Sequence, residues 1–218
     1  SLCSSCGDCV DICPAQALKI IGEKKTIGQV IQELWKDKDF YFASNGGITC
    51  SGGEPMLQIE FLRDLLMEAK SHNLHTAVDT AGAVAYENYA QILKYTDLFL
   101  YDIKLFDRQK HKKATGGDNQ LILQNIQKLS ADGARIIVRT PLIKGINDDL
   151  AEIDKIAAFL EPLQIELIQL LAYHSYGLGK YQNLDIKDTS ADFQAPDEDF
   201  LNQALEIYHQ HGLNAEIG

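Results

Sequence analysis

The sequence predicts an α/β protein built around a parallel sheet, on two observations. Short runs rich in β-branched residues alternate with helical stretches, and each run ends in a polar or glycine-rich break. Five such runs with helical crossovers imply a parallel sheet covered on both faces, as a partial or complete (β/α) barrel or as an open doubly wound sheet. The expected strands are residues 48–50, 75–81, 98–104, 135–141 and 165–174.

Two of the helical stretches place their apolar residues on one face each. Spacings of three and four residues predict a helix face that packs against the sheet. We expect a loop in the polar stretch 185–199 and core positions for two sets of residues: Leu57, Phe61, Leu62, Leu65, Leu66 and Ala69 in the first helix, and Ile153, Ile156, Ala157 and Leu160 in the second.

Composition limits the domain organisation and the class of partner. The 218 residues, 45% of them apolar, suffice for one large core with a small appended module, and we expect the module at residues 1–24 and a barrel domain at 25–218. The 31 acidic and 20 basic residues give a net charge of −11, which argues against nucleic acid or an anionic membrane as partner. Because there is no apolar run near about 18 residues, the expected location is the cytoplasm.

Four cysteines near the start follow the pattern C-x2-C-x2-C-x3-C-P: Cys3, Cys6, Cys9 and Cys13. This is the spacing of bacterial ferredoxins, in which thiolates on a tight loop hold a 4Fe–4S cluster and the fourth cysteine often serves a second cluster. Zinc is the alternative, although paired zinc knuckles are usually separated by a longer loop. The fifth cysteine, Cys50, is interpreted as a small buried hydrophobe at a strand end.

Polar groups follow each expected strand, at the edge where parallel α/β folds bind their ligands. The strand ends read SGGEP, DTAG, DIK, RTP and YH. The two glycines of SGGEP leave the backbone open to a ligand, and the carboxylate of Glu54 suits an ammonium group. Asp79 and Asp102 suit a cation, and Lys104 suits a carboxylate. Together these groups predict a site for an amino acid.

The ordered motifs ITCSGGEP, AVDTAG, LYDIK, RTPLIKGIND and LLAYHSYGLGKY resemble the radical S-adenosylmethionine enzymes that activate glycyl radical enzymes, the group typified by pyruvate formate-lyase activating enzyme. The resemblance runs from about Cys3 to His174. It implies a partial (β/α) barrel of radical S-adenosylmethionine type, with the end of a ferredoxin-like iron–sulfur insert at the N-terminus.

The resemblance also implies roles for single residues and for partners. By this resemblance, Gly52, Gly53 and Glu54 hold the methionyl amino group of S-adenosylmethionine, and Lys104 contacts its carboxylate. Asp79, Thr80 and Asp102 match positions that bind a monovalent cation near that carboxylate, and His174 matches a contact to the ribose. The implied reaction uses a reduced 4Fe–4S cluster and S-adenosylmethionine to form a 5′-deoxyadenosyl radical. That radical takes a hydrogen from a backbone glycine of a partner, pyruvate formate-lyase or a related enzyme. A flavodoxin or a ferredoxin-like protein is the implied electron donor.

The chain departs from the family pattern in one serious respect. The C-x3-C-x2-C motif that holds the catalytic cluster is absent, since the cysteines at 3, 6, 9 and 13 do not contain it. We therefore expect that the first strand of the barrel lies upstream of Ser1 and that this chain alone is inactive. We also expect strand 48–50 to be a sheet edge, with the cysteine segment over the gap, disordered, or joined to a neighbouring molecule.

Two other functions are compatible with the residues alone. A (β/α) barrel lyase would use Lys104 as a Schiff base, because a lysine at a barrel strand end is a familiar nucleophile. An iron–sulfur electron-transfer module would use the four cysteines, but it leaves the polar strand ends unexplained.

Overall fold

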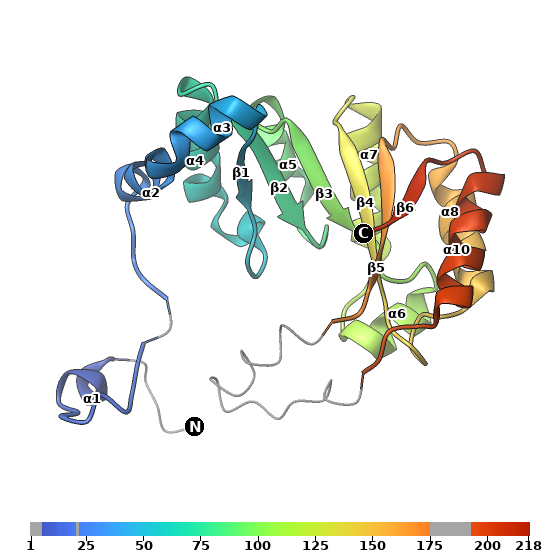
Figure 1. The fold of residues 1–218 in the computed structure, drawn as a ribbon, viewed down its shortest axis with the longest axis horizontal. Coiled ribbons are helices and arrows are strands. Elements are labelled where there is room, and N and C mark those ends of the chain that lie inside the picture. Colours follow the sequence, from blue (N-terminus) through green and yellow to red (C-terminus); the bar gives the residue numbers. More distant parts are fainter. Residues whose placement is uncertain (1–5, 21, 175–192) are drawn as a thin grey trace.

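Six strands form one sheet and lie side by side in the order of the chain. The computed structural model describes residues 6–20, 22–174 and 193–218, and within them every neighbouring pair of strands is parallel (Figure 1). Parallel strands in the order of the chain, joined by helices, form part of a (β/α) barrel, so the predicted partial barrel is confirmed. The strands are β1 Gly47–Cys50, β2 His75–Thr80, β3 Leu98–Asp102, β4 Ile136–Leu142, β5 Leu167–Ala172 and β6 Ala215–Ile217.

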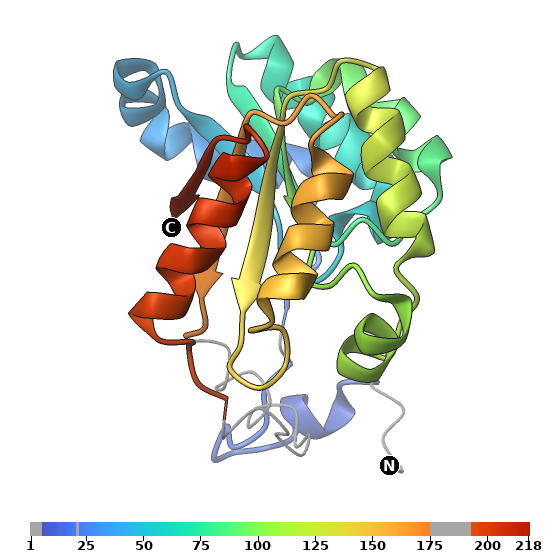
Figure 2. The same ribbon diagram turned by 90° about the vertical axis from the view of Figure 1, so that its right-hand side faces the viewer.

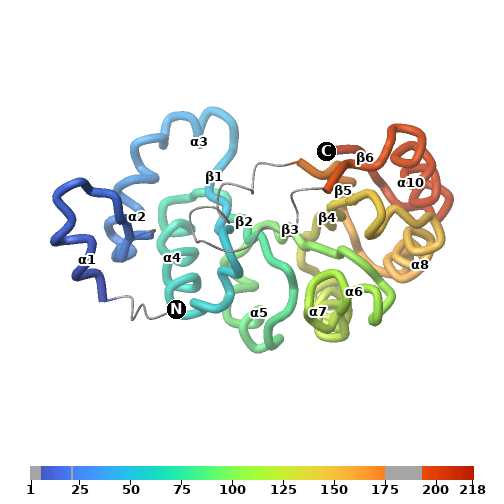
Figure 3. The backbone as a smooth tube through the Cα atoms, turned by 90° about the horizontal axis from the view of Figure 1, so that it is seen from below, coloured from blue at the N-terminus to red at the C-terminus, as the bar shows by residue number. Residues whose placement is uncertain are grey.

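The helices that connect the strands cover one face of the sheet. Figures 2 and 3 show α4, α5, α7, α8 and α10 on the convex side, while α1 lies away from the sheet on the side of the strands' carboxyl ends. The α-helices are α1 Asp8–Asp11, α2 Ile27–Leu34, α3 Lys38–Ser44, α4 Ile59–Ser71, α5 Tyr86–Ile92, α6 Arg108–Thr115, α7 Gln120–Ala131, α8 Leu150–Leu160 and α10 Glu198–Gln210. Short 3₁₀ turns are η1 Trp35–Asp37, η2 Pro55–Gln58 and η3 Leu93–Tyr95.

The two faces of the sheet differ among the described residues, where the expected cover on both faces is found on only one. Along β3, Phe99 and Tyr101 are buried while Leu100 and Asp102 remain partly exposed, and β4 alternates in the same way along its whole length. A period of two residues is the pattern of a sheet with one face packed and one face open. The concave face of the partial barrel is therefore available for a ligand.

The core lies between the convex face and the helices. Ile122, Ile126 and Leu129 of α7 and Leu201 of α10 join the strand residues in one large cluster of buried side chains. The predicted core face of α8 is confirmed for all four residues, and that of α4 for Leu62, Leu65, Leu66 and Ala69. Phe61 is only partly buried, and Leu57 is wrong: it lies in η2, before α4 begins, and is 76% exposed.

The strand positions agree with the sequence prediction, apart from their ends and one strand. The observed strands stop one or two residues before the predicted ends at 81, 104 and 174, because the chain turns away from the ladder at the polar residues. The sequence analysis missed β6, whose three residues are too short to show an alternating pattern. The expected loop at 185–199 is described only from residue 193, and α10 begins inside it at Glu198, capped by Asp197.

The strand β1 is an edge in the described part of the chain, as predicted, since it pairs only with β2. The helix α2 packs beside it and starts with a capping box, in which Thr26 accepts from the Gln29 amide and Gln29 accepts from the Thr26 amide. Within the described residues, every helix is too short or too polar to cross a bilayer.

Hydrogen bonds between charged side chains on the outer surface join the end of α10 to α8. His211, the C-cap residue of α10, bonds to Glu161 at 2.8 Å and to Asp154 at 3.1 Å. The hydrogen bonds to Glu161 and then to Asp154 raise the pKa of His211. A raised pKa in the folded state means that the protonated imidazole stabilises the fold.

We predict that His211→Gln lowers the midpoint of thermal unfolding at pH about 6 and leaves it unchanged at pH about 9. The contribution of His211 is complete below its unfolded pKa of about 6.5 and disappears as the pH rises through the higher folded value. Because Asp154 and Glu161 are exposed, the difference at pH about 6 should shrink in about 1 M salt. An equal loss at both pH values would contradict this account.

Candidate functional site

Four charged side chains from three neighbouring strands meet on the concave face, at the carboxyl edge of the sheet. Arg139 Nη2 of β4 binds Asp79 Oδ1 of β2 and lies 3.0 Å from Asp102 Oδ1 of β3. Lys104 Nζ, two residues beyond β3, lies 2.8 Å from the other oxygen of Asp102. Asp102 and Arg139 face each other in the strand register. The predicted grouping of Asp79, Asp102 and Lys104 is thus found, with Arg139 at its centre.

The network is partly shielded from water but still accessible. The side chains of Asp79, Asp102 and Arg139 are 23%, 18% and 20% exposed, and that of Lys104 is 34% exposed. Burial raises the pKa of Asp79, and the attraction of Arg139 offsets only part of this effect. The sheet therefore holds a carboxylate where its ionised form is disfavoured, which is characteristic of functional sites more than of structural ones.

Helix capping does not explain these two aspartates. Asp107, Asp149 and Asp197 do cap helices, because each accepts a hydrogen bond from a backbone amide of the first turn. Asp79 and Asp102 accept hydrogen bonds from the side chains of Arg139 and Lys104 instead. Helix capping therefore does not account for the position of Asp79 and Asp102 on the concave face.

The loop after β1 is held in shape by its own glutamate. Both carboxylate oxygens of Glu54 accept from the Thr80 hydroxyl at 2.9 Å, and further bonds come from the amides of Ala81 and Met56. The Glu54 carboxylate, which the sequence analysis assigned to an ammonium group of the ligand, therefore holds the loop against β2. Gly52 adopts a φ of +123° that favours glycine, and a Cβ at Gly52 or Gly53 would meet no atom within 4 Å. The backbone there stands open, as predicted.

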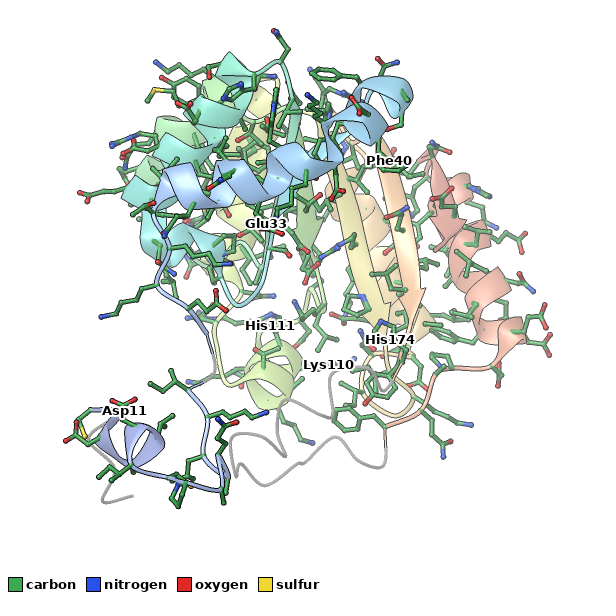
Figure 4. The ribbon with its side chains drawn as sticks, turned by 60° about the vertical axis from the view of Figure 1, so that its left-hand side comes forward. Asp11, Glu33, Phe40, Lys110, His111 and His174 are labelled. Carbon is green, nitrogen blue, oxygen red and sulfur yellow. The ribbon has the colours of Figure 1, made fainter. Side chains whose placement is uncertain are left out.

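His174, the predicted ribose contact, follows β5 and is exposed. Figure 4 shows it at the same end of the sheet as α6, which carries Lys110 and His111. Asp79, Thr80, Asp102, Lys104 and His174 thus all lie at or just beyond the carboxyl ends of their strands, although Thr80 itself is buried beneath Glu54.

The cysteine segment lies apart from the charged network. Cys6 and Cys9 are exposed, Cys13 is partly buried, and Cys3 lies outside the described residues. The Cys13 sulfur accepts from the Ala17 amide at 3.4 Å, and this bond, with those from neighbouring amides, lowers the pKa of the Cys13 thiol. Among the residues described, no three cysteine, histidine or acidic side chains come close enough together to hold a metal ion.

A cavity of about 640 Å³ lies along the free edge of β1. Apolar side chains line much of it, among them Val30 and Leu34 of α2, Ile48 of β1 and Leu62 of α4. It reaches the loop after β1, since Ser51 and Pro55 also line it. Cys50 lines it as well, and burial raises the pKa of the Cys50 thiol to about 11, as for a small hydrophobe and not a reactive thiol.

Comparison with protein families identifies the chain. The model of the radical S-adenosylmethionine superfamily matches residues 13–160. A trans-4-hydroxy-L-proline dehydratase activating enzyme of Clostridioides difficile is 41% identical over 248 aligned residues, which cover 99% of this chain and 82% of the relative. The chain belongs to the radical S-adenosylmethionine activating enzymes of glycyl radical enzymes. Enzymes of this superfamily use a 4Fe–4S cluster and S-adenosylmethionine.

Two further relatives support the same family. An isethionate sulfite-lyase activating enzyme of Nitratidesulfovibrio vulgaris is 43% identical over 188 residues, covering 85% of this chain and 61% of the relative. A 4-hydroxyphenylacetate decarboxylase activating enzyme of Clostridioides difficile is 35% identical over 222 residues, covering 100% of this chain and 70% of the relative. The chain thus spans between about three fifths and four fifths of these relatives.

Solved structures show the same fold. A domain of a pyruvate-formate lyase-activating enzyme from Bacteroides vulgatus superposes with a TM-score of 0.68 at 34% identity, covering 79% of this chain and 99% of that domain. SuiB of Streptococcus suis bound to S-adenosylmethionine superposes with a TM-score of 0.70 at 15% identity, which concerns the fold alone. The lyase and electron-transfer alternatives are not favoured, and the amine of Lys104 is engaged in an ion pair with Asp102.

The sequence analysis missed two features of the site. Arg139 appeared only as part of a strand end, because nothing in a single sequence pairs it with aspartates that precede it by 60 and 37 residues. The strand alternation was the available signal, since Arg139 falls among the partly exposed positions of β4. The hydrogen bonds that Glu54 accepts from Thr80 and from the Ala81 amide could not be predicted from the sequence pattern.

We predict that Asp79→Asn leaves the free energy of unfolding unchanged or increases it at pH about 7. Because the pKa of Asp79 is raised in the folded state, its ionised form lowers stability at neutral pH, and this penalty vanishes as the pH falls below about 3.9. Arg139 keeps Asp102 as a partner in the variant. Urea unfolding between pH about 4 and about 7 measures the difference.

The matched control is Asp97→Asn at the amino end of the same strands. Burial opposes ionisation of Asp97, but the bonds from Lys70 and Thr76 prevail and lower its pKa. Its contribution is therefore present above the unfolded pKa of about 3.9, and the variant should lose about 1–3 kcal/mol at neutral pH. Equal losses in both variants would show that Asp79 serves the fold.

Proposed function

We propose that the carboxyl edge of this sheet binds S-adenosylmethionine for the activation of a glycyl radical enzyme. The observation that carries the proposal is the network of Asp79, Arg139, Asp102 and Lys104 on the open concave face. Two cationic groups held by two carboxylates suit the carboxylate of an amino acid, because the charged network is preorganised and partly desolvated. The family membership of the chain supports this ligand.

Each end of the methionyl group has a candidate partner. Lys104 and Arg139 bind its carboxylate, and the open backbone of the loop 52–54 binds its ammonium group, while the Glu54 carboxylate keeps that loop on β2. His174 contacts the ribose. A monovalent cation at Asp79, Thr80 and Asp102 stays a prediction, and Arg139 supplies positive charge between the two aspartates.

The chemistry itself belongs to the bound groups. The reduced 4Fe–4S cluster and S-adenosylmethionine supply the radical that takes the hydrogen from the glycine of the partner. The residues of this chain bind and orient S-adenosylmethionine at the partly shielded network of Asp79, Asp102, Lys104 and Arg139. None of the residues described holds the catalytic cluster, so we propose no catalytic residue in this chain.

The cysteine segment, residues 1–24, is proposed to hold an accessory 4Fe–4S cluster through Cys3, Cys6, Cys9 and Cys13. The Cys13 thiol fits this role, because amide donors stabilise its thiolate form as they stabilise cluster sulfurs. Cluster binding would have to draw Cys6, Cys9 and Cys13 together, since they form no metal site in the structure. Metal analysis that finds zinc in place of iron and sulfide would contradict this assignment.

We propose that a strand carrying the C-x3-C-x2-C motif occupies the cavity beside β1. A parallel strand carrying C-x3-C-x2-C would satisfy the free amides and carbonyls of β1 and fill the apolar cavity of about 640 Å³. Its cysteine loop would then reach the carboxyl edge next to Ser51. Residues 25–218 would form the rest of the barrel domain.

The partner is proposed to be a glycyl radical enzyme of the dehydratase or lyase kind. Two relatives with more than 40% identity are named as activating a trans-4-hydroxy-L-proline dehydratase and an isethionate sulfite-lyase. We propose a flavodoxin or a ferredoxin-like protein as electron donor and the cytoplasm as location. Formation of a glycyl radical signal on a panel of candidate partners distinguishes among them.

We predict that Asp102→Asn weakens S-adenosylmethionine binding by about tenfold in the full-length, cluster-loaded protein, with little change in thermal stability. The substitution removes the charge that orients Lys104 and Arg139. Glu166→Gln is the control, because it removes a carboxylate from an exposed ion pair with Arg135 at the opposite edge of the sheet. Unchanged binding in Asp102→Asn, or an unfolded variant, would count against the site.

We predict that the 218-residue chain, given iron, sulfide, dithionite and S-adenosylmethionine, forms no 5′-deoxyadenosine above background. The chain lacks the three thiolates that would place a cluster against residues 52–54. Adding an upstream segment with C-x3-C-x2-C should restore the reaction. Turnover by the chain alone would mean that the cysteines at 3 to 13 hold the catalytic cluster.

A further inference from the structure

Buried side chains from three other segments bind the backbone of the β3–α6 loop, residues 104–107. Asn147 donates to the Lys104 carbonyl at 3.0 Å, and Asn119 donates to the next two carbonyls at 3.1 and 2.7 Å. Glu152 Oε1 accepts from the amides of residues 106 and 107. The loop therefore takes its hydrogen bonds from side chains where an ordinary surface loop would use water.

These three side chains are fully enclosed. Asn147, Asn119 and Glu152 are 4%, 2% and 0% exposed. The Glu152 carboxylate lies 3.6 Å from the Lys110 ammonium and 3.8 Å from that of Lys155. Burying polar and charged groups lowers the stability of the fold unless each group has well-placed hydrogen-bond partners. Helix α6 does not need these three side chains to begin, because Asp107 caps it. The arrangement therefore specifies one conformation of the loop.

Asn147 uses both ends of its amide to join the loop to β4. Its Nδ2 donates to the carbonyls of Lys104 and Pro141, the latter at 2.7 Å, and its Oδ1 accepts from the Ile143 amide at 2.7 Å. On the other side of Lys104, the Ile103 amide donates to the Arg139 carbonyl at 2.9 Å. The backbone of Lys104 is thus fixed to β4 from both directions.

The Lys104 side chain is 34% exposed, and its ammonium lies 2.8 Å from a carboxylate oxygen of Asp102. A lysine has about 2 kcal/mol of rotamer entropy, so its ammonium is well placed only where its backbone is fixed. A loop free to shift would spread the ammonium over many positions.

We propose that Asn147 is a positioning residue for S-adenosylmethionine binding and that it acts through Lys104. This inference rests on the proposed role of Lys104 at the methionyl carboxylate. Asn119 and Glu152 support the same loop farther along. None of the three is expected to touch the ligand.

A double-mutant cycle tests the proposal in the full-length, cluster-loaded protein. The dissociation constant of S-adenosylmethionine is measured for the parent, Lys104→Ala, Asn147→Ala and the double variant, with thermal unfolding of each. We expect about tenfold weaker binding in each single variant. The double variant should lose no more than about twofold further, because Asn147 affects binding only through the position of Lys104. Ser130→Ala removes one buried hydrogen bond, to Gln164 at the amino edge, and should lower stability without changing binding.

The outcomes separate this proposal from the function on which it rests. Unchanged binding in Lys104→Ala overturns the role of Lys104, and with it this inference. Weaker binding in Lys104→Ala with unchanged binding in Asn147→Ala overturns only the positioning role. Additive losses, about 100-fold in the double variant, show that Asn147 acts by a route other than Lys104 and overturn the proposal.

A second substitution covers the case in which Asn147→Ala does not fold. Asn147→Ser keeps a hydroxyl that can still form a hydrogen bond at this buried position. It should weaken binding in the same direction and again show no additional loss in the Lys104→Ala background. Binding equal to that of the parent in a folded Asn147→Ser protein would contradict the proposal.

Discussion

The site depends on one interaction, the guanidinium of Arg139 between the carboxylates of Asp79 and Asp102. Three parallel strands bring these groups together, and without the cation two carboxylates would repel each other on a partly desolvated face. Even with Arg139 present, burial raises the pKa of Asp79. The sheet thus holds charges in an arrangement that does not favour stability, as enzymes do where a charged ligand completes the site.

The open face explains why such a network is possible. A closed barrel would fill its interior with side chains, whereas here the concave side chains of β3 and β4 remain partly exposed. Buried amide side chains from a helix and from a loop nonetheless hold the loops that follow the strands. Asn125 of α7 donates to the carbonyls of Gly82 and Val84, just as Asn147 holds Lys104. Rigid loops at one edge are what a preorganised site requires.

Much of the fold was predictable from the sequence, because the patterns are local. The alternation of strands and helices gave the parallel sheet and the core faces of α4 and α8, and polar strand ends located the site. The rest depends on long-range contacts. Arg139 and Glu54 find their partners in other strands, Leu57 lies in a 3₁₀ turn before its helix, and three residues of β6 are too few for a pattern. The open concave face also depends on tertiary structure.

The most direct test of the central claim is a crystal structure of the full-length, cluster-loaded protein with S-adenosylmethionine. The account predicts that the methionyl carboxylate lies within hydrogen-bonding distance of Lys104 or Arg139 on the concave face, and that Glu54 still binds Thr80. S-adenosylmethionine bound elsewhere, with the network of Asp79, Arg139, Asp102 and Lys104 unchanged and out of contact, would contradict it.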